Sequence, residues 1–166
     1  MIRIRTAKDA DVASILEIYN QGIKDRIATL ETSEKDIEYM TDWFHNRSEK
    51  DTVLVAEDNG AIVGWASLNR YSHRCAYDGV ADLSIYIARS YRGKGIGKAL
   101  LSSIEKAAVQ SGIHKIVLFT FPFNKLGQGL YDSMGYREVG VFKEQGKIDG
   151  RYVDVMAMEK ILTGLS

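Results

Sequence analysis

A glycine-rich segment near the middle of the chain carries the residue types that phosphate binding needs. It runs from Arg92 to Lys98 and reads Arg-Gly-Lys-Gly-Ile-Gly-Lys. Its alternate glycines, Gly93, Gly95 and Gly97, have no Cβ, so the backbone there can approach a ligand closely. A helix is expected to follow at once, with unpaired N–H groups and a positive dipole end in its first turn. The segment therefore predicts a phosphate site, or else a turn that only caps a helix.

Two better-known phosphate-binding loops do not fit this segment. A P-loop needs a glycine where Arg92 stands and a serine or threonine where Ala99 stands. A dinucleotide-binding fingerprint needs a glycine at position 98, which is a lysine here. Neither of these two nucleotide-binding loops is therefore expected.

The histidines and the single cysteine do not form a metal-binding pattern. His45, His73 and His114 have no ligand spacing with one another or with Cys75, so no metal is expected. Cys75 lies near His73, and a Cys–His nucleophile pair is one reading of this proximity. Closeness in sequence does not establish the geometry of such a pair, so a structural cysteine is favoured.

The elements around the glycine-rich segment are predicted to be a strand before it and a helix after it. Residues 81–88 alternate as a half-buried strand does. One face of this strand carries Leu83, Ile85 and Ile87, and the other carries Asp82, Ser84 and Tyr86. The helix has apolar residues at helical spacing from Ile96 onward and ends at Gly112.

The rest of the chain continues this mixture of strands and helices. Further strands are predicted at 2–6, 53–56, 62–68, 116–119, 136–142 and 152–159, and further helices at 8–19, 34–44 and 125–134. Ala10, Ala13 and Ile37 are expected on buried helix faces, and the apolar run 116–119 is expected to be covered on both faces. With no repeat or linker, the sequence predicts one α/β domain over residues 1–166, built on a central twisted mixed sheet flanked by helices.

Composition excludes several classes of protein. Lysine plus arginine and aspartate plus glutamate each total 22, which argues against a nucleic-acid-binding protein. The N-terminus lacks the apolar core of a signal peptide, and no apolar stretch approaches the roughly 20 residues of a membrane span. A single cysteine fits a reducing compartment. We therefore expect a cytoplasmic protein without a membrane or nucleic-acid partner.

The ordered motifs resemble those of one enzyme family. Arg-x-x-Gly-x-Gly at 92–97, Asn124 after the next strand, and Tyr131 to Tyr136 follow one another as in GNAT-family N-acetyltransferases. Within the family, the chain is most similar to the phosphinothricin and methionine sulfoximine acetyltransferases. That similarity rests on segments along most of the chain, namely 18–20, 29–32, 43–44, 76–78 and 150–155. The resemblance implies the GNAT acyl-CoA N-acyltransferase fold and acetyl-CoA as cosubstrate.

The resemblance also implies which residues contact acetyl-CoA. Pantetheine in this family binds like an added strand, here along the backbone of Ile85, Tyr86 and Ile87. The pyrophosphate binds at the glycine-rich turn, Arg92, Gly93, Lys94, Gly95, Ile96, Gly97 and Lys98. Asn124, Tyr131 and Ser133 complete the implied cofactor contacts, although Asn124 could equally serve as a helix N-cap.

Catalytic and substrate residues follow from the same resemblance. Asp82 stands where the family has a glutamate base, and it is one methylene shorter, so a water relay or simple ammonium binding are alternatives. Tyr131 is the implied proton donor to the thiolate, against a core-packing role. Arg74, Tyr77 and, in the irregular stretch 22–31, Glu31 are the implied substrate contacts. Ser72 replaces the family's nearby lysine.

The implied reaction is direct transfer in a ternary complex from acetyl-CoA to the amino group of a small glutamate-like amino acid. A tetrahedral intermediate would then release the coenzyme A thiolate. The physiological role, detoxification or metabolism, stays open. A different small amine or a peptide N-terminus remains an alternative acceptor, and a non-catalytic acyl-CoA-binding module remains an alternative class. The family also implies a homodimer.

Overall fold

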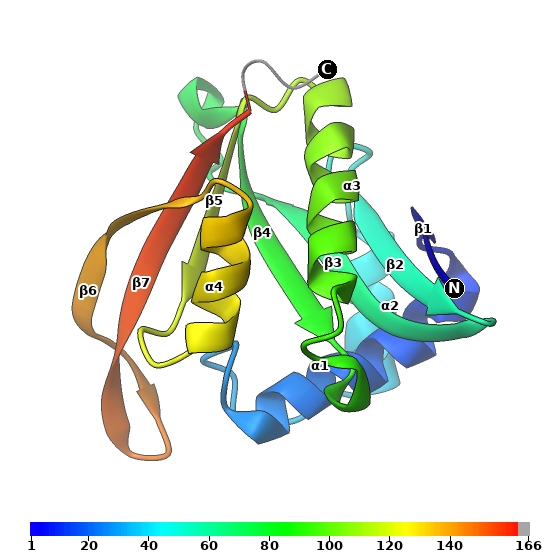
Figure 1. The fold of residues 1–166 in the computed structure, drawn as a ribbon, viewed down its shortest axis with the longest axis horizontal. Coiled ribbons are helices and arrows are strands. Elements are labelled where there is room, and N and C mark those ends of the chain that lie inside the picture. Colours follow the sequence, from blue (N-terminus) through cyan, green and yellow to red (C-terminus); the bar gives the residue numbers. More distant parts are fainter. Residues whose placement is uncertain (163–166) are drawn as a thin grey trace.

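One seven-stranded mixed sheet forms the centre of the computed structural model, which describes residues 1–162 (Figure 1). The strand order is β1-β2-β3-β4-β5-β7-β6. The strands are β1 (Ile2–Thr6), β2 (Val53–Asp58), β3 (Ala61–Arg70), β4 (Val80–Ile87), β5 (Lys115–Thr120), β6 (Arg137–Ile148) and β7 (Arg151–Ile161). The predicted mixed sheet flanked by helices is confirmed. Residues 163–166 of the predicted domain lie outside the described residues.

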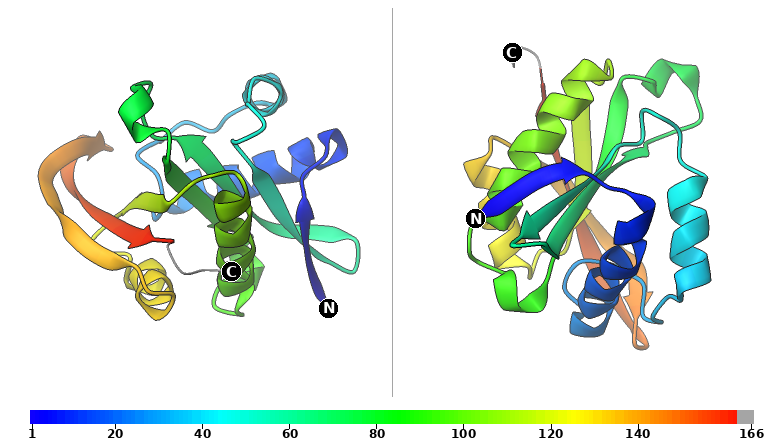
Figure 2. Two further views of the ribbon diagram at one scale, coloured as in Figure 1. Left: turned by 90° about the horizontal axis from the view of Figure 1, so that it is seen from above. Right: turned by 90° about the vertical axis from the view of Figure 1, so that its right-hand side faces the viewer.

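Four α-helices in the described part of the chain cover the two faces of the sheet (Figures 1 and 2). They are α1 (Val12–Asp25), α2 (Ile37–His45), α3 (Ile96–Gln110) and α4 (Lys125–Ser133). Helices α3 and α4 lie on one face, and α1 and α2 lie on the other. The long β6–β7 hairpin curves away at one edge of the sheet.

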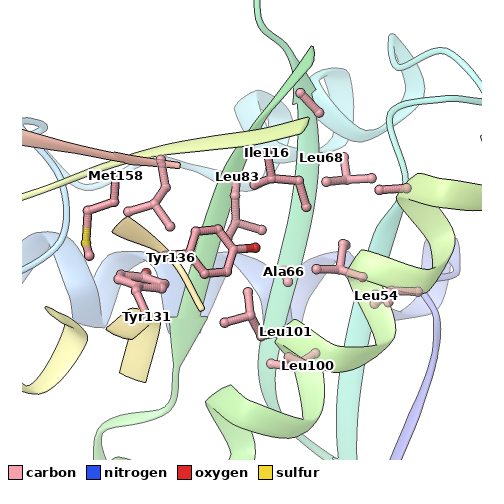
Figure 3. Close-up of a cluster of buried hydrophobic side chains, with 14 of the residues drawn as sticks. Leu54, Ala66, Leu68, Leu83, Leu100, Leu101, Ile116, Tyr131, Tyr136 and Met158 are labelled. Carbon is pink, nitrogen blue, oxygen red and sulfur yellow. The ribbon is translucent and has the colours of Figure 1, made fainter. Parts of the chain in front are cut away.

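The larger core lies between α3, α4 and the sheet (Figure 3). Leu100, Leu101 and Ile104 of α3 are fully buried because they recur at helical spacing on its inner face. They pack on sheet residues such as Leu68 and Leu83, and each such side chain contributes roughly 1.5–3 kcal/mol to folding. This packing fixes where α3 begins, which matters for the site below.

The smaller core lies under α1 and α2, and here two sequence predictions about burial are wrong. Helix α1 begins at Val12 rather than near residue 8, because Asp9–Asp11 form a short 3-10 helix first. The Asp11 carboxylate holds that turn by accepting hydrogen bonds from Arg5 Nη1 (2.7 Å) and Lys8 N (2.8 Å). Ala10, before the helix, and Ala13, on its outer face, are exposed rather than buried.

The start of α2 is also later than predicted. Asp36 caps this helix by accepting a hydrogen bond from Tyr39 N at 2.9 Å, so Ile37 becomes its first residue. Ile37 is 51% exposed instead of buried, whereas Met40, one turn further, is 2% exposed. The apolar face of α2 therefore begins one turn later than its sequence pattern indicated.

Strands β4 and β5 run parallel and then separate. Their pairing joins Val80 to Lys115, Ala81 to Ile116 and Asp82 to Val117, and it ends there, although β4 continues to Ile87 and β5 to Thr120. The expectation that 116–119 is covered on both faces is wrong, since Phe119 is 44% exposed. Its side chain lies beside the opening between the two strands.

Candidate active site

The opening between β4 and β5 leads into a cavity of about 610 Å³. The cavity extends from the separating strands to the N-terminal ends of α3 and α4. Most of the predicted cofactor residues line it: Ile85, Tyr86, Ile87, Arg92, Gly93, Gly95, Gly97, Lys98, Asn124, Tyr131 and Ser133. Because β4 has no partner strand beyond Asp82 on this side, its peptide groups there are available to an extended ligand.

The glycine-rich turn needs its glycines for two different reasons. Gly93 and Gly95 have φ of 77° and 86°, a left-handed conformation that other residues adopt at a cost. Gly97 lies inside α3, and a Cβ there would meet Leu130 Cδ2 at 2.8 Å, so this glycine permits α3 and α4 to pack closely. The turn thus directs the N-terminal N–H groups of α3 at the cavity wall.

Two predicted members of this turn do not line the cavity. Ile96 is 2% exposed and belongs to the core, and Lys94 Nζ lies 5.4 Å from the centre of the Tyr91 ring. Lys98, in the first turn of α3, does line it. Lys98 and the helix N-terminus therefore supply positive potential at this end.

Arg92 lines the cavity, but its guanidinium is already bound within the chain. Arg92 Nη1 lies 2.6 Å from Asp25 Oδ2, and Nε donates to the Ile87 carbonyl at 3.2 Å. Arg89 also pairs with Asp25 at 2.8 Å, so two arginines hold the pKa of that carboxyl below its usual range. Arg92 thereby joins α1 to the glycine-rich turn.

Asn124 serves as a helix cap and also holds a loop beside the cavity. Its Oδ1 accepts a hydrogen bond from Gly127 N at 3.0 Å, which caps α4, and its Nδ2 donates to the Ile27 carbonyl at 3.2 Å. The N-cap alternative raised by the sequence is therefore correct for this conformation. The loop that Asn124 holds covers one side of the cavity with residues 27–30.

Asp82 occupies the last paired position before the two strands separate. Burial raises the pKa of Asp82 to about 6, against the opposing effects of hydrogen bonds from the Asn69 side chain and the Leu83 backbone. A carboxyl with this pKa is ionised at neutral pH and still basic enough to accept a proton from an amine. The position and the protonation equilibrium both suit a general base.

A second, smaller hollow opens on the other side of Asp82. Its volume is about 450 Å³, and it is lined by Arg70, Tyr71, Ser72, Arg74, Tyr77, Asp82 and Phe119. Arg74 and Tyr77, both predicted as substrate contacts, thus lie with Asp82 around one space. Asp82 and Phe119 line both this hollow and the larger cavity. Asp82 therefore borders both spaces.

Tyr131 lines the larger cavity from α4 and packs against Tyr136 with ring centres 5.9 Å apart. Burial raises the pKa of its hydroxyl, so Tyr131 stays protonated throughout the physiological pH range. Tyr131 packs in the hydrophobic core and also lines the cavity, so the packing and proton-donor roles are compatible (Figure 3).

Glu31 is the predicted substrate residue that lines neither space. Its carboxylate pairs with Lys35 Nζ at 2.9 Å on the surface. Its neighbours Ile27, Ala28, Thr29 and Leu30 do line the larger cavity. The stretch 22–31 was expected to be a loop, next to a site or not, but these four residues were not predicted as contacts. Their apolar side chains, in a stretch that has neither helical nor strand periodicity, were the signal that could have identified them as lining residues.

Two features are absent from residues 1–162. No group of three or more histidine, cysteine, aspartate or glutamate side chains in this part of the chain could hold a metal ion. No helix in it is long and apolar enough to cross a membrane. Cys75 is an exposed thiol in the short 3-10 helix beside Arg74.

Comparison with known proteins places these features in a family. A family model described as an acetyltransferase (GNAT) domain matches residues 4–157. The L-amino acid N-acyltransferase MnaT of Escherichia coli is 30% identical over 94% of this chain and 91% of its own length. The L-methionine sulfoximine/L-methionine sulfone acetyltransferase of Pseudomonas aeruginosa is also 30% identical, over 94% and 92%.

A solved structure agrees in fold over nearly the whole chain. It is that of a GNAT-superfamily phosphinothricin acetyltransferase from Sinorhizobium meliloti in complex with acetyl-CoA. The TM-score is 0.90 with 30% identity, covering 96% of this chain and 88% of the other.

Proposed function

This chain belongs to the GNAT acetyltransferase family, and on that premise we propose that it transfers the acetyl group of acetyl-CoA to the α-amino group of a small glutamate-like amino acid. Phosphinothricin and methionine sulfoximine are the acceptors we favour. The observation that carries the proposal is that Asp82 lines both the larger cavity and the smaller hollow. A base in that position can remove a proton from an amine held in one space while the amine attacks an acyl group held in the other.

The larger cavity fits acetyl-CoA in its chemistry. The unpaired stretch of β4, Ile85 to Ile87, matches the amides of pantetheine, and the glycine-rich turn with Lys98 matches the pyrophosphate. Asn124 and Ser133 supply further polar groups along the wall. Bound there, acetyl-CoA supplies an activated thioester.

Asp82 would act first, because an amino acid's amine is an ammonium ion at neutral pH and has no lone pair. With a pKa of about 6, the ionised Asp82 carboxylate accepts the ammonium proton, directly or through one water. Its side chain is one methylene shorter than the glutamate of the family pattern, which favours the water-relayed path. Tyr131, kept protonated by burial, holds a proton available for the leaving thiolate.

The smaller hollow supplies the groups that recognise an acidic acceptor. Arg70 and Arg74 are the cations in its lining, and arginine can bind two oxygens of a carboxylate or phosphinate at once. Tyr71 and Tyr77 contact edge to face at 5.6 Å between ring centres and form an aromatic wall. A glutamate-like amino acid, with its α-carboxylate and a phosphinate or other strongly polar oxygen-bearing side chain, suits this set of groups.

The test is an acceptor screen that measures thiol release from acetyl-CoA for the native protein, Asp82→Asn and Arg74→Ala. We expect turnover on phosphinothricin or methionine sulfoximine. Asp82→Asn should lower kcat by about 100-fold or more, since general-base catalysis contributes roughly 10²–10⁴-fold. Arg74→Ala should raise KM for acidic acceptors more than for neutral amino acids.

Different failures of this screen have different meanings. Turnover only on unrelated amines or on peptide N-termini would keep the acetyltransferase and refute the acidic acceptor. Acetyl-CoA binding without turnover on any amine would refute the catalytic function and favour an acyl-CoA-binding module.

We also infer that two copies of the chain associate through the β6–β7 hairpin. Strand β6 is one of the two outer strands of the sheet, and its Val139, Val141 and Phe142 are exposed, as is Tyr152 of β7. An uncovered strand edge with apolar side chains favours pairing with another chain. Analytical ultracentrifugation should give a dimer mass that Val141→Lys reduces toward the monomer; a native monomer would refute the association.

A further inference from the structure

A line of polar side chains crosses β3 and β4 behind Asp82. In the antiparallel register Asn69 lies directly opposite Asp82, and Ser67 lies directly opposite Ser84. Alternation along each strand puts these four side chains on one face of the sheet. Trp65 and Tyr86, which continue these two rows, pack against residues of α1 and α2, so this is the face that α1 and α2 cover and α3 lies on the other side.

The hydrogen bonds of Asn69 determine which way its amide points. Arg47 Nη2 lies 3.0 Å from Asn69 Oδ1, and Ser67 Oγ donates to the same oxygen at 3.1 Å. A guanidinium can only donate hydrogen bonds, so the group facing it must be the amide oxygen. The NH₂ group consequently faces the opposite way, where Nδ2 donates to Ser84 Oγ at 3.0 Å, on the strand that carries Asp82 directly opposite Asn69.

Arg47 is itself held in place, so the orientation it imposes is fixed. Its Nε donates to the Asp51 carbonyl at 3.0 Å, and Nη2 donates to the Leu68 carbonyl. Its guanidinium also lies over the Trp43 ring, 4.4 Å from the ring centre. The side chain thus connects the end of α2 to the end of β3.

We propose that Asn69 is a positioning residue for Asp82: with its oxygen held by Arg47 and Ser67, it directs an N–H at the Asp82 carboxylate and orients it toward the junction of the two cavities. The inference rests on the proposed function, in which Asp82 accepts the proton. Asn69 itself lines neither cavity and would act through Asp82 alone.

Asn69 has a direct effect on the protonation of Asp82. Burial raises the pKa of Asp82 to about 6, and the Asn69 hydrogen bond holds it from rising further. The charged and titratable groups around this carboxylate are Arg70, Arg74, Tyr71 and Tyr77 in the smaller hollow, Tyr86 on β4, and Arg47 behind Asn69. Asp82 must be ionised to act as a base. Removing the Asn69 hydrogen-bond donor should raise the pKa of Asp82, so the carboxylate should stay protonated and inactive up to a higher pH.

The test is the pH dependence of kcat/KM for the acceptor in the native protein, Asn69→Ala and Asn69→Asp. In the native protein, kcat/KM should decrease at low pH with an apparent pKa near 6, and this decrease is the acidic limb of the profile. Asn69→Ala should move it up by about one pH unit, the size expected for one lost hydrogen bond to a charged group. Asn69→Asp keeps the contact with Arg47 but adds a like charge, so it should move the limb further.

A control separates this effect from added charge alone. Asn46→Asp makes the same chemical change at the exposed end of α2 and should leave the limb where it is. Uniform loss of activity at all pH values in Asn69→Ala, with the limb unmoved, would overturn the inference and leave Asn69 a structural role.

A measurement without turnover keeps the inference independent of the proposed function. Carbon-13 NMR of labelled aspartate carboxyl groups, with Asp82→Asn used for assignment, gives the Asp82 pKa directly. A rise in Asn69→Ala supports the inference even if no acceptor is found, and an unchanged pKa refutes it. If the pKa rises but Asp82→Asn remains fully active, the proposed base is wrong and the pairing with Asn69 stands.

Discussion

Burial prepares two side chains of the site for opposite proton transfers, Asp82 to accept a proton and Tyr131 to donate one. Burial favours the neutral form of both, so it makes Asp82 a stronger base and Tyr131 a weaker acid than either would be in water. Asp82 stays ionised above about pH 6, and Tyr131 stays protonated. Both groups are therefore in the working state near neutral pH.

Tyr131→Phe should separate the proton-donor role from the packing role, because phenylalanine preserves the ring. We expect kcat to fall by about 100-fold, the lower end of the range for general acid catalysis, with the Kd of acetyl-CoA nearly unchanged. Steady-state kinetics together with calorimetric binding would check this. A variant with native kcat would assign Tyr131 to the core alone.

At the scale of elements, the start of α3 depends on the backbone conformation of Gly95. Its φ of 86° is unfavourable for any residue with a Cβ, at a cost of about 1–2 kcal/mol. Gly95→Ala should therefore shift the first turn of α3 and weaken acetyl-CoA binding by roughly 10-fold or more, as a fluorescence or calorimetric titration would measure.

Gly129→Ala is the matched control for that prediction. Gly129 also lines the larger cavity, but an added Cβ would meet nothing within 4 Å, and its φ is not in the left-handed region. Alanine in α4 should leave binding unchanged and stabilise the helix by up to about 1 kcal/mol. Equal weakening by both substitutions would contradict the conformational explanation.

Sequence patterns predicted the elements that repeat regularly and missed those that depend on distant contacts. The alternation in β4 and the helical spacing in α3 are local, so both were predicted correctly. The continuation of α1 to Asp25 was missed, since it is supported by ion pairs to Arg89 and Arg92 some 65 residues away.

The site was predicted in a similar way. The glycine-rich turn is a motif with short spacing, Asp82 was implied by the family resemblance, and the structure brings both to one cavity. Asn69 and Arg47 were missed because their importance arises from strand register and from the end of a helix 22 residues earlier. Phe119 was misjudged because the separation of β4 from β5 leaves no trace in a continuous apolar run.

At the scale of the whole molecule, the ionised Asp82 carboxylate should lower the free energy of unfolding at neutral pH. The pKa of Asp82 is raised in the folded state, so its contribution is fully present below the unfolded pKa near 4 and is lost as pH rises through about 6. Asp82→Asn removes this loss. The variant should therefore be more stable than the native protein at pH 8, by roughly 1–3 kcal/mol, and equally stable near pH 4.

Denaturant unfolding at several pH values would check this expectation. The difference in unfolding free energy should grow between pH 4 and pH 6 and then level off. A constant difference across that range would mean that the substitution acts through packing. A growing difference would identify a part of the fold's stability that is given up for activity.

The separation of β4 from β5 also bears on solubility. Beyond Asp82 the sheet contains an internal edge, where the peptide groups of β4 face the cavity instead of a neighbouring strand. Such an edge is a template for any extended chain, including an unfolded segment of another molecule. A ligand bound along this edge of β4 also prevents other chains from pairing with it. The ligand-free protein is therefore the form most prone to aggregation.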